Sequence, residues 1–226
     1  MIADSVELFT FTSNHNNLET VLSTTALKKQ YGPIKAVNGL DLRVEKGAVY
    51  GILGPNGSGK TTTLGMLLGI IQPTSGAYSW FNNGSLDINR KRIGSLLEQP
   101  NFYPYLSGEQ NLKKKKKIKG VDEGTIDAVL ASVNLLERKT SPARTYSLGM
   151  RQRLALASAL LGNPDVLLLD EPTNGLDIPS KSQFRKIMTE AMLDERMIII
   201  STHQVRDMVN LIDPIIIVEN GQVIFQ

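Results

Sequence analysis

The stretch "GPNGSGKTT", residues 54–62, decides the fold class of this chain. It fits the pattern G-x-x-x-x-G-K-[ST], in which glycines let the backbone fold tightly enough for successive amides to converge on phosphate groups. The continuous apolar run "AVYGIL", residues 48–53, leads into it and predicts a strand covered on both faces. The helix-like "TTTLGMLLGII" overlaps its end, and the N-terminus of a helix adds a favourable dipole. The sequence therefore predicts a phosphate-binding site between a buried strand and a helix.

Two side chains of this loop carry the chemistry expected of a nucleoside triphosphate site. Lys60 is predicted to supply a point charge to the β- and γ-phosphates, and the hydroxyl of Thr61 to bind Mg²⁺. The alternative, an ordinary glycine turn, matches the pattern by chance in about one chain in a hundred of this length. The strand before the loop and the helix after it make chance rarer still. The residues expected to contact the phosphates are Gly54, Pro55, Asn56, Gly57, Ser58, Gly59, Lys60, Thr61 and Thr62.

Another buried strand is predicted at "VLLLDEP", residues 166–172, which contains two adjacent carboxylates. Asp170 is expected to hold Mg²⁺, directly or through water, and Glu171 to act as general base on the attacking water. An apolar strand that ends in acids is common, so this motif alone is weak evidence. Combined with Lys60 and Thr61, it predicts nucleotide hydrolysis.

Two predicted helix N-termini are candidates to contact a nucleotide that the phosphate loop holds. A helix N-terminus suits this role because it presents free backbone amides and the hydroxyl of its capping residue. In "YSLGM", Ser147 is a good N-cap, helix formers continue through residue 161, and "GNP" then stops the helix. The strand that ends at Asp170 begins at once. This short separation favours "YSLGM" as the helix start that contacts a nucleotide.

The other helix start, "LSGEQ" at residues 106–110, lies farther along the chain from that strand. It leads into lysines, and Glu109 puts an acid where a phosphate would have to approach. We therefore expect this stretch to be a helix cap, with Ser107 as the N-cap residue.

Strands and helices alternate along most of the chain, which predicts an α/β fold with a mostly parallel sheet. Later strands are predicted at "MIIIS" and in "IIIVENGQVIF", where an Asn-Gly pair favours a tight turn, and a helix is predicted from about Lys181. Residues from about 101 to 145 are polar and helix-prone, and are expected to form an inserted helical subdomain of a domain at residues 21–226. Residues 1–20 are expected to be a loose extension.

The composition narrows the classes of protein. A chain of 226 residues, 41% of them hydrophobic, can bury a sizeable core. Its net charge of +3 neither demands nor excludes a polyanionic partner. The absence of cysteine excludes disulfides and thiolate metal sites. The longest apolar runs are far shorter than the roughly 20 residues of a membrane-spanning helix, and the N-terminus does not read as a signal peptide. We expect a soluble cytosolic chain.

In the order of these motifs the chain resembles the ATP-binding subunit of an ABC transporter, over roughly residues 25–225. The resemblance implies a P-loop NTPase fold whose mostly parallel sheet carries an N-terminal antiparallel β subdomain and an inserted α-helical subdomain. It identifies residues 54–62 as the Walker A loop and residues 166–171 as the Walker B strand. It also implies a signature that would close over ATP bound to a second copy. The signature residues are Ser147, Leu148, Gly149 and Met150.

The resemblance implies nucleotide contacts for Tyr31, Val37 and Asp177 and a catalytic role for His203. Tyr31 would stack on adenine with Val37 packed nearby, Asp177 lies in the D-loop "NGLD", and His203 in "STH" would be the switch histidine. Each of these residues also has a plainer alternative. Tyr31 could be only an aromatic at a strand end, and His203 only a core histidine. Asp177 could cap the following helix, alone or in addition to its D-loop role. For His203, the position directly after an apolar strand favours ligand contact, because ligands collect at the carboxyl ends of parallel strands.

Two departures from the family pattern bear on the subfamily. The signature has Tyr146 where leucine is usual and Leu-Gly-Met for Gly-Gly-Gln, which resembles subunits paired with separate ABC-2-type membrane proteins. The family's Q-loop glutamine aligns with Glu98, with Gln99 beside it. A glutamate there resembles exporters of bacitracin- and lantibiotic-like antimicrobial peptides. We expect Glu98 to face the metal.

Five consecutive lysines, residues 113–117, are predicted to be a solvated helix face. Two alternatives stay open for them. One is attraction to anionic lipid beneath a membrane partner, and the other is contact with nucleic acid.

The leading interpretation is an ATPase that binds ATP and Mg²⁺ and forms a homodimer on ATP binding. It would power separate integral membrane permease subunits, at the inner face of the cell membrane, that export a drug, a peptide or a polysaccharide. The alternative is a non-transport ABC ATPase that acts on nucleic acid or ribosomes. Such chains usually have a long coiled coil or tandem ATPase halves, so no stable nucleic-acid partner is expected. A GTPase or small-molecule kinase would explain neither the signature nor the histidine.

Overall fold

The computed structural model of the chain describes residues 19–82, 89–97, 102–120, 125–204, 212, 214–219 and 221–225. Almost all of the expected loose extension, residues 1–20, therefore lies outside the described residues. The same holds for the Asn of the predicted Asn-Gly turn, although the strands on both sides of that turn are described and pair antiparallel.

The larger sheet has the strand order β5-β6-β7-β3-β8-β9. Neighbouring strands from β5 to β8 run parallel, whereas β9 runs antiparallel to β8. The predicted α/β fold with a mostly parallel sheet is thus confirmed. The bounds of the strands are β3 (Val49–Leu53), β5 (Ile93–Leu96), β6 (Val166–Asp170), β7 (Met197–Thr202), β8 (Ile215–Glu219) and β9 (Gln222–Phe225).

Both faces of this sheet are covered, because successive residues of a strand point to opposite sides. Leu167 and Ile198 belong to one buried cluster, and Leu168 and Ile199 belong to another. Every residue of β6 and β7 is buried. A strand buried on both faces has no polar alternation, which is why these segments read as continuous apolar runs in the sequence.

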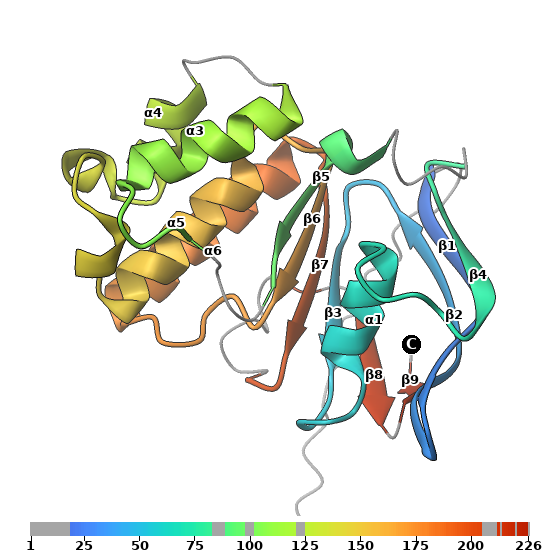
Figure 1. Cartoon of the computed structure of the whole chain (residues 1–226). Coiled ribbons are helices and arrows are strands. Elements are labelled where there is room, and N and C mark those ends of the chain that lie inside the picture. Colours follow the sequence, from blue (N-terminus) through green and yellow to red (C-terminus); the bar gives the residue numbers. More distant parts are fainter. Residues whose placement is uncertain are drawn as a thin grey trace, which may run out of the picture.

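Helices α3, α4, α5 and α6 pack on one side of the larger sheet (Figure 1). Leu112 of α3, Leu130 of α4 and Phe184 of α6 are fully or almost fully buried in the cluster that this packing forms. Within the described ranges, no helix combines the length and apolarity that crossing a bilayer requires. The bounds are α3 (Gly108–Lys119), α4 (Thr125–Ser132), α5 (Leu148–Leu160) and α6 (Ile178–Leu193).

The stretch expected to be an inserted helical subdomain contains α3, α4 and two 3-10 helices, η2 (Leu136–Arg138) and η3 (Ala143–Thr145). Its helical content agrees with the prediction. Its status as a separate subdomain stays a prediction.

A second, antiparallel sheet and helix α1 cover the other side of the larger sheet (Figure 1). Its strands are ordered β2-β1-β4, which matches the antiparallel β region that the family resemblance implies. The indole N–H of Trp80, at the end of β4, donates to the carbonyl of Leu67 at 2.9 Å and so ties this sheet to α1. The bounds are β1 (Thr20–Tyr31), β2 (Ile34–Glu45), β4 (Ser75–Trp80) and α1 (Lys60–Leu67).

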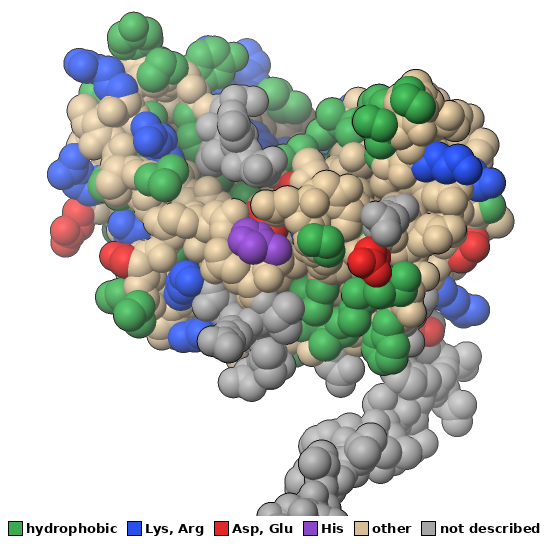
Figure 2. Space-filling model, turned by 90° about the horizontal axis from the view of Figure 1, so that it is seen from below, with side chains coloured by type: hydrophobic (Ala, Val, Ile, Leu, Met, Phe, Trp, Pro, Cys, Tyr) green, Lys and Arg blue, Asp and Glu red, His purple; other side chains and the backbone are tan. Residues whose placement is uncertain are grey.

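The carboxyl ends of the central parallel strands meet at one edge of the larger sheet. Leu53 at the end of β3 pairs with Thr202 of β7, and Asp170 at the end of β6 pairs with Ser201. Figure 2 looks from below at the side toward which β6 and β7 run in Figure 1. The middle of that side is mainly backbone and uncharged polar surface, with lysines and arginines mostly towards its margins. The phosphate loop predicted from the sequence leaves β3 at this edge.

Candidate nucleotide site

The loop at residues 54–62 runs between two strands that leave no room for a side chain at two of its glycines. A Cβ added at Gly54 would lie 2.2 Å from the carbonyl oxygen of Val218, and one added at Gly59 would lie 2.2 Å from that of Ala36. Gly59 is also the N-cap of α1 with a φ of 104°, which glycine adopts without steric cost. Strands β8 and β2 therefore hold the loop in a conformation that requires glycine at both positions.

Lys60 points back into this loop. It is 6% exposed, and its ammonium donates hydrogen bonds to the carbonyl oxygens of Gly54 at 2.8 Å and Pro55 at 3.0 Å. The hydroxyl of Ser58 is buried there without a hydrogen-bond partner. Because an anionic oxygen is a stronger partner for an ammonium than a carbonyl is, the loop is suited to accept a phosphate.

Thr61 and Asp170 come together although they lie far apart in the sequence. The hydroxyl of Thr61 donates to Asp170 Oδ2 at 2.7 Å, and the hydroxyl of Ser201 donates to Asp170 Oδ1. Asp170 is fully buried. A hydroxyl and a carboxylate oxygen are ligands that hard cations such as Mg²⁺ prefer, so the pair fits the metal role predicted for it.

The carboxylate of Glu171, the residue after β6, makes three contacts with the residues that end and follow β7. Its carboxylate accepts the hydroxyl of Thr202 at 3.2 Å and the backbone N–H of His203 at 3.1 Å, and His203 Nδ1 lies 2.7 Å from Oε1. The backbone of Glu171 has a φ of 46°, in the left-handed region that is costly for a residue with a side chain. The backbone N–H donates to the carbonyl of Ser201 at 2.9 Å. These bonds fix the direction of the carboxylate.

His203 follows β7 directly, as predicted, and its side chain is 39% exposed. Its neighbour Gln204 donates to the side-chain oxygen of Asn174 at 3.3 Å. The histidine therefore lies at the surface of the site, between Glu171 and Asn174 of the D-loop, rather than enclosed in the core.

Sequence reasoning missed three polar residues that orient the two acids. Ser201 and Thr202 donate their hydroxyls to Asp170 and Glu171, and Gln152 of α5 donates to the backbone carbonyl of the residue after Glu171 at 3.3 Å. The signal for the first two was present, since hydroxyl residues that end a buried apolar strand meet whatever lies at the same sheet edge. Gln152 gave a weaker signal, a polar residue in a mostly apolar helix.

Ser147 caps α5 as predicted, since its hydroxyl accepts the N–H of Met150 at 3.2 Å. The residues after it touch the D-loop. A Cβ added at Gly175 would lie 2.6 Å from Leu148 Cδ2, and one added at Gly149 would lie 3.5 Å from the carbonyl oxygen of Gly175. The signature and the D-loop therefore form one continuous surface.

Asp177 caps the following helix. Its Oδ1 accepts the N–H of Ser180 at 2.9 Å, and hydrogen bonds from Ser180 lower the pKa of the Asp177 carboxyl. The plainer of the two expected roles is thus present. A contact between Asp177 and a nucleotide stays a prediction.

Tyr31 and Val37 lie on adjacent strands near the loop. Tyr31 ends β1 and is 47% exposed, and the Lys29 ammonium lies 4.9 Å from the centre of its ring. Val37 is 2% exposed, and its Cγ2 would lie 3.4 Å from a Cβ added at Gly59. Val37 therefore packs against the loop while the Tyr31 ring stays accessible, and adenine stacking stays a prediction.

The "LSGEQ" stretch is a helix cap, as predicted. The Ser107 hydroxyl accepts the N–H of Gln110 at 3.1 Å, and the Gln110 side chain accepts the N–H of Ser107 at 2.9 Å. This reciprocal capping box starts α3.

The two similar helix starts also pack on each other, which the sequence did not reveal. Tyr146, directly before the signature, is 3% exposed, and its hydroxyl donates to the carbonyl of Arg138 at 2.7 Å. A Cβ added at Gly108 would lie only 2.5 Å from that hydroxyl. Burial raises the pKa of Tyr146. Because Gly108 has no side chain, the ring of Tyr146 can pack against it.

The residue expected at the Q-loop, Glu98, and its neighbour Gln99 lie outside the described residues. The expectation that Glu98 faces the metal therefore stays a prediction.

The structure brings five predicted residues to one edge of the sheet and leaves the signature elsewhere. Lys60 and Thr61 begin α1, Asp170 and Glu171 end or follow β6, and His203 follows β7. In Figure 1 the N-terminal end of α5, where the signature lies, is at the far left, whereas α1 lies on the other side of the larger sheet. A single copy therefore presents its phosphate loop and its signature on different parts of its surface.

Comparison with known proteins identifies the family. A family model described as "ABC transporter" matches residues 37–174. The chain is 40% identical over 212 residues to the bacitracin transport ATP-binding protein BcrA of Bacillus licheniformis, covering 92% of this chain and 69% of that protein. It is 35% identical over 206 residues to the lantibiotic transport ATP-binding protein SrtF of Streptococcus pyogenes, covering 91% and 90% of the two chains.

Solved structures agree with the sequence relatives. The chain matches an ATP-binding subunit of an ABC transporter with a TM-score of 0.82 and 27% identity, over 90% of this chain and 88% of the other. It matches a bacterial ABC transporter cassette, solved as a dimer, with a TM-score of 0.83 and 26% identity, over 90% and 97%. The chain therefore belongs to the ABC transporter family, as one of its ATP-binding proteins, which hydrolyse ATP to drive transport.

Proposed function

We propose that the edge formed by Lys60, Thr61, Asp170 and Glu171 binds and hydrolyses Mg-ATP on behalf of a separate integral membrane permease. The observation that carries this proposal is the 2.7 Å hydrogen bond between Thr61 and Asp170. It joins the start of the phosphate-loop helix to the acid-ended strand, so that groups for phosphate, metal and water meet at one point.

The phosphate loop would hold the triphosphate through its backbone amides and Lys60. On binding, the ammonium of Lys60 exchanges the carbonyls of Gly54 and Pro55 for phosphate oxygens, which are stronger acceptors. Tyr31 would stack on adenine, and Val37 already supports the loop from β2.

Thr61 and Asp170 would hold Mg²⁺, with Glu98 facing the same ion. Mg²⁺ is usually bound by one or two carboxylates together with substrate phosphates and water, which agrees with a site of one buried carboxylate and one hydroxyl. The ion supplies neutralisation of the phosphate charge that develops during transfer.

Glu171 would act as the general base, and His203 would position it. A base must point at the attacking water before reaction, and the contacts from Thr202 and His203 fix the direction of this carboxylate. The left-handed backbone of Glu171 turns the residue out of the strand, which is a costly conformation of the kind that recurs at functional sites.

A second copy would complete the site. Ser147 and Gly149 would approach the γ-phosphate of the partner's ATP with the free amides at the start of α5, since the two parts lie apart in one copy. Leu148 and Ile178, which flank this surface, are 60% and 81% exposed, and Met150 and Asp177 lie beside them. Apolar side chains exposed on such a surface are suited to be covered by another protein.

The transported substrate would be an antimicrobial peptide of the bacitracin or lantibiotic kind, moved outward. This follows from the relatives whose names state those substrates, at 40% and 35% identity over more than nine tenths of the chain. The chain would then act at the inner face of the cell membrane, bound to its permease.

The change Lys60→Ala tests the proposal directly. We expect ATP affinity to fall about tenfold to a hundredfold, because a hydrogen-bonded charge contact to phosphate is lost. Calorimetric titration measures the affinity, thermal unfolding followed by circular dichroism confirms that the fold is kept, and Lys46→Ala on the surface is the control. Unchanged ATP affinity in folded Lys60→Ala would refute the assignment.

A further inference from the structure

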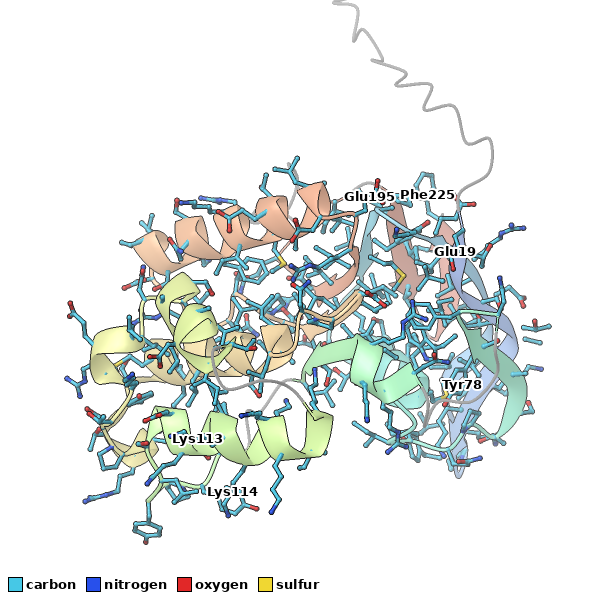
Figure 3. The ribbon with its side chains drawn as sticks, turned by 90° about the horizontal axis from the view of Figure 1, so that it is seen from above. Glu19, Tyr78, Lys113, Lys114, Glu195 and Phe225 are labelled. Atoms are coloured by element: carbon cyan, nitrogen blue, oxygen red, sulfur yellow. The ribbon has the colours of Figure 1, made fainter. Side chains whose placement is uncertain are left out.

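The turn between β8 and β9 lies beside the phosphate loop, although the two are far apart in the sequence. Strand β8 pairs parallel with β3, and Ile217 lies opposite Leu53, the last residue before the loop. Strand β9 then returns antiparallel and ends at Phe225, which Figure 3 labels across the molecule from Lys113 and Lys114 of α3. The turn is at the other end of β9, next to the loop.

Gly221, in this turn, connects the phosphate loop to β2 by two backbone hydrogen bonds. Its N–H donates to the carbonyl of Ser58 at 3.0 Å, and its own carbonyl accepts the N–H of Asn38 at 2.6 Å. Gly221 is buried. Because a buried backbone group that loses its partner is costly, both bonds should persist in the folded chain. One residue therefore joins the loop, β2 and the turn.

The position of Gly221 leaves no room for a side chain. Its φ of 75° lies in the left-handed region, and a Cβ added to it would lie 2.7 Å from the carbonyl oxygen of Ala36. A Cβ added at Gly59 would lie 2.2 Å from the same oxygen. The Ala36 carbonyl therefore packs against both Gly59 of the loop and Gly221 of the turn, so a shift of the turn is passed on to the loop.

The bond from Gly221 to Ser58 also sets the direction of a neighbouring amide. In a planar trans peptide the C=O and the N–H of the next residue point in opposite directions. The Ser58 carbonyl points at the turn, so the Gly59 N–H points away from it. The first bond within α1 runs from the Thr63 N–H to the Gly59 carbonyl at 2.8 Å. The Gly59 N–H is therefore one of the amides at the helix start that are directed to partners outside the helix, such as a phosphate.

We propose that Gly221 is a positioning residue of the ATP site, which acts through the Ser58 carbonyl to aim the Gly59 amide at a phosphate of the bound nucleotide. The proposal rests on the proposed function of the phosphate loop, and it adds to that site a residue that follows every motif named above in the sequence. Gly47 provides the comparison, because it has nearly the same φ, 78°, but a Cβ added there would meet nothing within 4 Å.

The variants Gly221→Ala and Gly47→Ala separate positioning from a merely structural role. Both place a side chain on a left-handed backbone, so both should lower the free energy of unfolding, whereas only Gly221→Ala pushes against Ala36. In calorimetric titration we expect the affinity for ATP to fall about tenfold in Gly221→Ala, because one hydrogen bond to a charged phosphate is weakened, and to be unchanged in Gly47→Ala. In steady-state hydrolysis by Gly221→Ala, KM for ATP should rise and kcat should change little, since this amide would bind the ground state and the transition state alike.

Nuclear magnetic resonance reports on the Gly59 amide directly. In protein made by cell-free synthesis with ¹³C′-serine and ¹⁵N-glycine, an HNCO spectrum shows only the glycines that follow a serine, which are Gly59, Gly76 and Gly108. Without nucleotide, Gly221→Ala should shift the Gly59 signal and leave the other two in place, and Gly47→Ala should shift none of them. An unshifted Gly59 signal in folded Gly221→Ala, or an equal loss of ATP affinity in both variants, would overturn the proposal.

A measurement on the parent chain decides the matter if Gly221→Ala does not fold. Coupling is reciprocal, so if the Gly221 bond raises nucleotide affinity about tenfold, bound nucleotide must stabilise that bond by the same factor. Saturating Mg-ADP should therefore slow the hydrogen exchange of the Gly221 amide about tenfold and leave that of Gly47 unchanged. Normal Mg-ADP binding without an effect at Gly221 would overturn this proposal alone, whereas the absence of any Mg-ADP binding would refute the proposed ATP site and this proposal with it.

Discussion

The absence of a side chain at Gly108 leaves space for Tyr146, the residue directly before the signature. A Cβ at this position would lie 2.5 Å from the Tyr146 hydroxyl, and the residue after Tyr146 is the signature serine. We predict that Gly108→Ala lowers the free energy of unfolding by about 1–3 kcal/mol, because Tyr146 must move from its buried position. Urea unfolding measures this change.

The contact between Gly108 and Tyr146 can be isolated by a double-mutant cycle. Tyr146→Phe alone should cost about 0.5–1.5 kcal/mol, since its hydrogen bond to the Arg138 carbonyl is lost. In that background Gly108→Ala should cost less than it does alone, because the nearest atom is gone and the next, Tyr146 Cζ, lies 3.3 Å away. Strictly additive costs would show that the two residues are not coupled through this contact.

Glu98 carries a prediction that the described residues do not address. A carboxylate beside the phosphates favours metal and disfavours ATP without metal, because it adds negative charge near Asp170 and Glu171. We expect Glu98→Ala to weaken the Mg²⁺ dependence of hydrolysis, measured as activity against Mg²⁺ concentration, and Gln99→Ala to be mild. The reverse pattern would shift the Q-loop assignment by one residue and remove one support for the peptide-exporter assignment.

At the residue scale, sequence reasoning found the groups whose chemistry is local. Lys60 and Thr61 follow from one loop motif, and Asp170 and Glu171 from one strand. Sequence reasoning missed the hydroxyl donors Ser201 and Thr202 and the packing of Tyr146 against Gly108. These contacts depend on which segments become neighbours after folding. The positive φ of Glu171 is likewise set by its three-dimensional partners and not by the residue itself.

At the scale of elements, two helices start with the same serine cap, and we propose that only the second contacts a nucleotide. Ser107 caps α3 and Ser147 caps α5. We predict that Ser107→Ala and Ser147→Ala each cost about 1 kcal/mol of unfolding free energy, because each loses an N-cap. Only Ser147→Ala should also reduce ATP hydrolysis.

Steady-state phosphate release and urea unfolding on the same samples make this comparison. Loss of hydrolysis in Ser107→Ala with normal hydrolysis in Ser147→Ala would exchange the roles of the two motifs.

Element boundaries followed the sequence where burial or capping is local. The continuous apolar runs of the sequence form the fully buried strands β3, β6 and β7. Helix α6 begins at Ile178, three residues before the predicted start, because Asp177 caps it and a proline occupies its first turn. Lys113, Lys114 and Lys117 of the lysine run are exposed, whereas Lys115 within the run and Lys119 after it are partly buried.

At the scale of the whole molecule, the proposed ATP site is shared between two copies of the chain. In one copy the phosphate loop and Glu171, the proposed base, lie at the edge of the larger sheet. The signature lies at the N-terminal end of α5, away from that loop (Figure 1). We propose that a complete site forms between two copies and that ATP joins them.

Light scattering of Glu171→Gln with saturating Mg-ATP tests this claim most directly. The change removes the base and keeps the binding contacts, so ATP should stay bound and the protein should elute as a dimer, whereas without nucleotide it should be a monomer. Adding Lys60→Ala should return it to a monomer by removing ATP binding. A nucleotide-bound Glu171→Gln that remains a monomer, or a dimer that forms equally well without ATP, would contradict the account.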